Sequence, residues 1–326
     1  MEKKRQVIVF FYVIMRLRCF MNEKIKTFWQ NIDKELNKFN GKFKYDIKQR
    51  ITRVIREFNI SRDNLYEYMN KDDLTLFKSE LQDNKNDDMS DYLKYKVDKM
   101  LSRTKIKYWE ALQLLIDLAY FQMFNRNKKF EDELFTATMT YTSEFYQRIS
   151  YDVRKPIRKF KMWPFPNHII PHLMSTPLYL GYNWLEYKQN LIDYNANKTY
   201  RKIVVGIAQN NFDIKTYERS FEIERKRYMT ALDNEVASLS SQVALWGMEK
   251  QGIKKVIYVA VMDDRTTNIC QSMNGQVFNV NEWNIYYRYA NNNDERMTKY
   301  ETKGLQIGEN QPSLHYNCRS VLYPYK

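Results

Sequence analysis

Glycine is scarce in this chain, with 8 residues among 326, against a usual share of about 7%. Folds built on many tight turns, or on loops that wrap phosphate groups, need glycine for its conformational freedom. The phosphate-binding patterns G-x-x-x-x-G-K-[ST] and G-x-G-x-x-G are both missing. The shortage therefore argues against a nucleotide-binding site of either type and favours a mainly helical protein.

Cysteine is equally rare, because Cys19, Cys270 and Cys318 are the only three. Three cysteines so far apart do not form a disulfide framework. Cys270 and Cys318 could pair with each other, but a reducing cytoplasm would keep both as thiols.

Long hydrophobic runs are missing as well. The longest one near the N-terminus, residues 7–15, follows three basic residues as a signal peptide does. It is too short for a membrane span of about 20 residues, and no small-residue cleavage site follows it. We expect no membrane partner, and we interpret residues 1–20 as a mis-called start upstream of Met21 or as an N-terminal arm.

Proline is concentrated in one place, since five of the seven prolines lie within residues 156–182. Proline removes a backbone donor and clashes with the preceding helical turn. This segment is therefore expected to be a junction between a helical domain, residues 21–155, and a second domain, residues 183–326. Ile47, Ile51 and Val54 illustrate the helical spacing of apolar residues in the first domain. Ser61 and Ser90 are the expected N-caps of two of its helices.

The charge of the chain is strongly positive, with 53 Lys and Arg residues against 39 Asp and Glu residues and a net charge of +14. Residues 263–326 contain seven of each and are neutral, so the whole excess lies in residues 1–262. A basic body suits contact with a polyanion such as DNA. The alternative is that the charge reflects a composition rich in Lys, Asn and Tyr and is simply solvated surface.

The fold class expected from these patterns is α+β, with a mainly helical body and a small C-terminal module. A helical stretch runs to Gln251 and is followed by Gly252, at the position where a left-handed residue ends a helix. Val256–Met262 is apolar and β-branched, as a strand should be. The module should therefore be a short sheet packed on a long helix.

A series of motifs follows this strand. The segment Asp263-Asp264-Arg265-Thr266-Thr267 precedes Cys270 and the pair Asn274-Gly275, and residues 315–319 read His-Tyr-Asn-Cys-Arg. In this order the motifs resemble those of the phage Mu F-like head morphogenesis family, the minor head proteins of tailed bacteriophages. Glu235 stands at a distance before Gly252 that suits a glutamate of that family.

The resemblance implies a minor head protein inside the phage head, made in the host cytoplasm, with no catalytic role and no cofactor. Its implied partners are the portal protein, the major capsid protein and double-stranded DNA bound without sequence preference. The implied attachment site is a clasp of ten residues. They are Glu235, Asp263, Asp264, Arg265, Thr266, Cys270, Gly275, His315, Cys318 and Arg319.

Two departures from the family pattern bear on metal binding. Thr267 and Ser320 stand where the family often has its first and last cysteines. Zinc could still be held by Cys270, His315 and Cys318, but packing and hydrogen bonds could equally hold the clasp. In that second interpretation Arg265 and Arg319 pair with Asp263, Asp264 or Glu235. The alternative function is a metal- or cysteine-dependent hydrolase of head morphogenesis, with Cys270 and His315 as nucleophile and base.

Overall fold

The computed structural model describes residues 23–86, 88–152, 184–250, 252–262, 266–279 and 319–325. These residues divide into two compact units. Unit 1 takes residues 1–42, 131–185 and 230–326, and unit 2 takes residues 43–130 and 186–229. Each unit thus combines segments that are distant in the sequence, whereas the sequence analysis expected consecutive domains. The proline-rich segment expected at residues 156–182 lies outside the described residues, as do residues 1–20.

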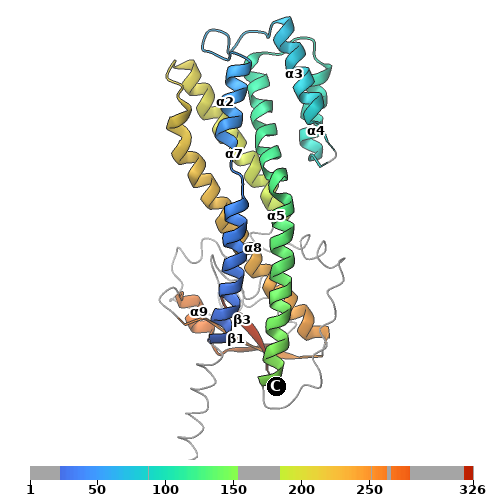
Figure 1. Cartoon of the computed structure of the whole chain (residues 1–326), viewed down its shortest axis with the longest axis vertical. Helices are drawn as coiled ribbons and strands as arrows, with labels where there is room; N and C mark the ends of the chain where they lie inside the picture. The colour runs from blue at the N-terminus through green and yellow to red at the C-terminus, as the bar shows by residue number, and fades with distance from the viewer. Residues whose placement is uncertain are drawn as a thin grey trace, which may run out of the picture. The chain divides into compact units, whose positions relative to one another are not determined.

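The elements in the described part of unit 2 are all helices (Figure 1). Its elements are α2 (Ile47–Glu57), α3 (Lys71–Asn84), α4 (Asp91–Ser102), the first part of α5 (Tyr108–Asp152), most of α7 (Trp184–Ala208), the short helix η1 (Ile214–Tyr217) and the start of α8 (Glu218–Lys250). Ser90 caps α4 by accepting a hydrogen bond from the Leu93 amide at 3.3 Å, as expected. The expectation for Ser61 was wrong, because Ser61 lies in a turn and Asn70 caps the next helix, α3.

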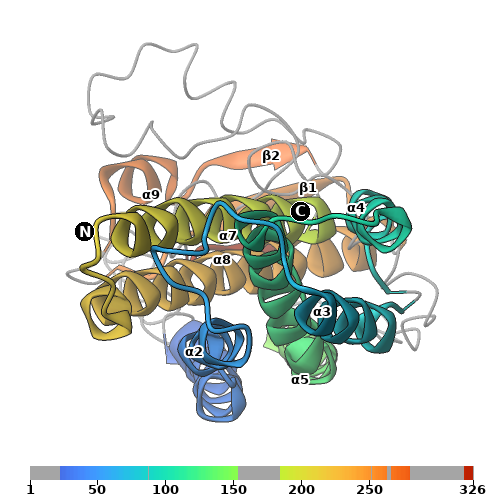
Figure 2. The same ribbon diagram turned by 90° about the horizontal axis from the view of Figure 1, so that it is seen from above.

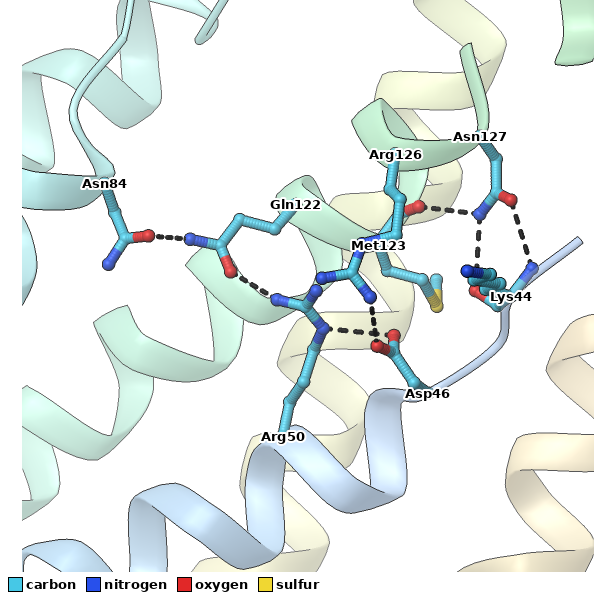
Figure 3. A network of polar contacts seen from close by, with 8 residues as sticks. All are labelled: Lys44, Asp46, Arg50, Asn84, Gln122, Met123, Arg126 and Asn127. Atoms are coloured by element: carbon cyan, nitrogen blue, oxygen red, sulfur yellow. Dashed lines mark hydrogen bonds and ion pairs between the residues drawn. The ribbon is translucent and has the colours of Figure 1, made fainter. Parts of the chain in front are cut away.

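The chain breaks its helical path at residues 43–46, just before α2, and a buried amide stabilises the break (Figure 3). The side-chain oxygen of Asn127 accepts from the Lys44 amide at 3.1 Å. Its nitrogen donates to the carbonyls of Lys44 at 3.3 Å and Met123 at 2.8 Å. Buried backbone groups need partners, so this side chain replaces the hydrogen bonds that a continuous helix would supply. Beside it, Asp46 binds Arg50 at 3.0 Å and Arg126 at 2.6 Å.

The core of unit 2 combines aromatic packing with a buried carboxyl group. The Tyr228 ring stacks on Phe43 and meets Phe124 edge-on, with both centroid distances at 4.9 Å. One oxygen of Glu224 accepts from the hydroxyls of Tyr45 at 3.0 Å and Tyr120 at 2.7 Å. Burial raises the pKa of Glu224, an effect that these two hydrogen bonds oppose.

Unit 1 contains a helix over residues 23–42, the later parts of α5 and α8, and the C-terminal module. Phe28 of the first helix stacks on Phe145 of α5 with ring centroids 4.6 Å apart. Thr142 of α5 donates to Ser240 of α8 over 3.0 Å. The core of this unit is thus formed by helices from opposite halves of the chain.

The module consists of β1 (Lys255–Val259), α9 (Asn268–Met273), β2 (Val277–Asn279) and β3 (Val321–Tyr325). The strand order is β2-β1-β3, and both pairings are antiparallel. Figure 2 shows β1 and β2 side by side. Ile257 pairs with Val277 on one side and with Tyr323 on the other. A small sheet beside long helices confirms the α+β class.

Two boundaries of the module follow from local chemistry. Gly252 has a φ of 70°, a left-handed conformation that suits the end of α8, as the sequence predicted. The expected strand Val256–Met262 is shorter than predicted, because side chains take over its backbone partners. The Asn274 side chain accepts from the Ala260 amide at 3.1 Å, and the Thr266 hydroxyl donates to the Val261 carbonyl at 2.5 Å.

No helix in the described part of the chain combines the length and the apolar character that a membrane span requires.

Candidate functional site

Two threonines, Thr266 and Thr267, hold the chain just before α9. Thr266 binds the Val261 carbonyl, and its own carbonyl accepts from the Gln271 side chain at 3.0 Å. The Thr267 hydroxyl accepts from the Cys270 amide at 3.3 Å and caps α9. Threonine is a good N-cap residue. The residue that stands in place of the family's first cysteine therefore has a clear role in starting this helix.

Cys270 lies in α9 and is buried, with 3% of its surface exposed. Its sulfur is 3.3 Å from the hydroxyl oxygen of Tyr258 on β1. The Ser320 hydroxyl donates to the same sulfur over 3.2 Å. Ser320 stands where the family often has its last cysteine, so the two positions meet in space although 50 residues separate them.

The Asn274-Gly275 turn returns the chain to the sheet. Gly275 has a φ of 87°, which side-chain-bearing residues rarely adopt. Its amide donates to the Tyr258 carbonyl at 2.8 Å, and the Tyr258 amide donates to the Gln276 carbonyl at 2.9 Å. The positive φ of Gly275 thus allows β2 to begin beside β1.

The closing strand is attached to the first described helix. The indole nitrogen of Trp29 donates to the Arg319 carbonyl at 2.7 Å. The Arg319 guanidinium lies 3.5 Å from the carboxylate of Asp33. Tyr323 of β3 meets Phe145 edge-on, with ring centroids 6.0 Å apart. The C-terminal module therefore depends on residues near the start of the chain, which the sequence analysis did not connect to it.

Glu235 is buried in α8, and burial raises its pKa to about 8. Among the described residues, one of its carboxyl oxygens has no hydrogen-bond partner. The sequence analysis gave Glu235 as one possible partner of Arg265 or Arg319. Arg319 pairs with Asp33 instead, and Arg265 is outside the described residues. Nearby, Asp233 has a pKa raised to about 6, first by burial and then by the charge of Asp33, while Arg319 lowers it.

Five of the ten expected clasp residues are described, and all five lie in unit 1. Thr266, Cys270 and Gly275 shape the turn and the sheet, Arg319 contacts the first described helix, and Glu235 is buried in α8. The other five are outside the described residues. They are Asp263, Asp264, Arg265, His315 and Cys318.

Zinc binding stays a prediction, because His315 and Cys318 are not among the described residues. Within the described part of the chain, no three residues of the types His, Cys, Asp and Glu lie close enough to hold a metal ion. Within that part, the Cys270 sulfur contacts the hydroxyl groups of Tyr258 and Ser320.

The sequence analysis missed three contributors to this site. Ser320 was noted only as a lost cysteine, although its position in the motif series was a signal that it meets Cys270. Trp29 and Asp33 carried no such signal, because nothing in a single sequence links them to residue 319.

Comparison with known proteins agrees with the motif series. Residues 196–323 match a family model described as Phage Mu protein F like protein. No curated protein and no solved structure was found to be similar to the chain.

Proposed function

Because residues 196–323 match the model of the phage Mu protein F-like family, we propose that this chain is a phage head morphogenesis protein, specifically a minor head protein attached to the portal. It would lie inside the phage head, next to the major capsid protein and the packaged double-stranded DNA. The observation that carries the proposal is the family match over the C-terminal module and the helices before it. The proposal assigns the chain a binding role and no catalytic one.

The proposed attachment surface is the C-terminal module of unit 1. Val277 on β2 and Tyr325 on β3 are large apolar side chains that remain exposed, at 37% and 46%. They belong to the two outer strands of the sheet, on either side of β1. Exposed apolar side chains and strand edges are common features of protein interfaces. These two residues are therefore the proposed contacts with the portal protein.

The proposed DNA-binding surface lies on unit 2, which is mainly helical. Unit 2 contains 27 Lys and Arg residues against 20 Asp and Glu residues. Lysine and arginine bind DNA through its phosphates, which makes affinity independent of sequence and strongly dependent on salt.

A binding assay with purified portal protein tests the attachment. The full chain should co-purify with the portal, and the double variant Val277→Asp/Tyr325→Asp should lose most of that association. The matched control, Tyr92→Asp/Tyr95→Asp, changes two exposed side chains of α4 in unit 2. Undiminished association of the first variant, with circular dichroism equal to that of the wild type, would reject this surface.

The hydrolase alternative gains nothing from the described geometry. A cysteine nucleophile must reach its substrate and carries a lowered pKa in a partly exposed, electropositive site. Cys270 is buried beneath Tyr258 and Ser320 instead. We therefore propose a structural role for this thiol.

A further inference from the structure

A groove in unit 2 lies between α2 and η1, and its lining is basic. It has a volume of about 680 Å³ and is open to solvent. Lys48, Arg53 and Arg56 come from α2, and Lys215 comes from η1. Among the described residues that line the groove, Glu57 carries the one carboxylate. Four cationic side chains against one anionic one make the groove attractive to anions.

Two of these cations are already neutralised within the unit. Lys48 forms an ion pair with Glu218. Arg53 lies 3.4 Å from Glu57 and 2.5 Å from Glu80. These pairs fix the two side chains along the groove but reduce the charge that they offer to a ligand.

The other two cations are available for binding. Arg56 and Lys215 are both exposed. Within the described part of the chain, neither side chain has an ion pair or a hydrogen bond. Each can therefore bind an anion without first breaking an internal contact.

The length of the groove indicates the kind of anion. A helix rises about 1.5 Å per residue, so α2 carries its cations from Lys48 to Arg56 over about 12 Å. One strand of duplex DNA advances about 3.4 Å per nucleotide, so the same length corresponds to roughly three phosphates. A single phosphate ion would use only a part of this row, whereas a nucleic-acid backbone would follow it.

We propose that the groove between α2 and η1 holds the phosphate backbone of duplex DNA, with Arg56 and Lys215 as its principal contacts. The inference rests on the proposed DNA-binding role and names the surface that performs it. Lys48 and Arg53 contribute by shaping the walls. Glu57 opposes binding, because its carboxylate repels phosphate and attracts Arg53.

The test measures the affinity of the full chain for a fluorescent 30-base-pair duplex at several salt concentrations. The variant Arg56→Gln/Lys215→Gln should lower affinity at low salt by about tenfold. It should also reduce the slope of log affinity against log salt by about two, since two phosphate contacts are lost. Glu57→Gln should raise affinity. The control Lys99→Gln/Lys105→Gln removes the same charge from α4 and the segment after it, and should change the slope little.

The possible outcomes distinguish the groove proposal from the broader proposal that the chain binds DNA. Wild-type protein that fails to bind the duplex at low salt would reject the DNA-binding role and the groove together. Wild-type binding that Arg56→Gln/Lys215→Gln leaves unchanged, or that the control lowers equally, would reject the groove alone. Inorganic phosphate at matched ionic strength should not displace the duplex, and displacement at millimolar phosphate would identify a single-anion site instead. Circular dichroism should show equal helix content in all variants.

Discussion

The hydroxyl of Ser320 donates a hydrogen bond to the sulfur of Cys270 over 3.2 Å, inside the C-terminal module. These two positions are those where the related family often has cysteines. A serine at position 320 keeps a polar contact with Cys270 but cannot form a disulfide with it. This hydrogen bond joins the segment before β3 to α9 at a place where a second thiol would also fit.

The first prediction places a second thiol beside Cys270. In a Cys318→Ser background, Ser320→Cys should form a disulfide with Cys270 under mild oxidation. Closing a loop of 50 residues should raise the free energy of unfolding by about 4 kcal/mol. Urea unfolding with and without reductant measures the gain, and peptide mapping identifies the bond. Thiols that stay free after oxidation would show that the two positions are not adjacent in solution.

The second prediction concerns pH and Glu235. Because the folded-state pKa of Glu235 is raised to about 8, the folded protein favours the protonated acid. Its contribution to stability is complete below the ordinary pKa of glutamic acid and is lost as pH rises towards 8. The loss should be on the order of 4 kcal/mol. Thermal unfolding between pH 5 and 8 should therefore show a falling melting temperature.

Glu235→Gln should flatten this pH dependence, since the amide does not ionise. Asp233→Asn is the matched control, and it should affect mainly the lower part of the range because the pKa of Asp233 is raised only to about 6. An unchanged profile in Glu235→Gln would mean that the carboxyl is solvated or paired in the folded state.

The sequence predicted features that depend on neighbouring residues and missed features that depend on distant segments. Local chemistry was readable: the Ser90 cap, the end of α8 at Gly252 and the strand around Val256 all depend on neighbours within a few residues. The family motifs added the turn at Asn274 and Gly275, where the chain returns to the sheet. Each of these needs only one short segment to be recognised.

Relationships between distant segments were not readable. The division into two units, each combining separated parts of the chain, follows from long helices such as α5, whose length no local pattern fixed. The hydrogen bond from Trp29 to residue 319 spans 290 positions. A single sequence contains no signal for such a pair, because tryptophan in an apolar helical face only predicts burial.

The third prediction tests the break before α2. Asn127→Ala should lower the free energy of unfolding by about 2 kcal/mol, because the amide and carbonyl of Lys44 lose their buried partner. Asn197→Ala is the control, since Asn197 is exposed on α7 and its change should cost less than about 0.5 kcal/mol. Urea unfolding followed by circular dichroism measures both. Equal effects in the two variants would contradict the proposed role of Asn127.

The fourth prediction addresses zinc. Purified protein should contain no stoichiometric zinc by elemental analysis, because Thr267 and Ser320 replace two of the thiolates that the family pattern offers to a tetrahedral zinc ion. A chelator should then leave the melting temperature unchanged. Stoichiometric zinc that disappears in Cys318→Ala would contradict this account and would revive the hydrolase alternative.

The most direct test of the minor head role is to count this chain in purified phage particles by quantitative mass spectrometry. Particles assembled with and without the portal protein provide the comparison. The account predicts a few copies per complete particle, far fewer than the major capsid protein, and none in particles that lack the portal. A chain that is absent from complete particles, or present in equal amounts without the portal, would contradict it.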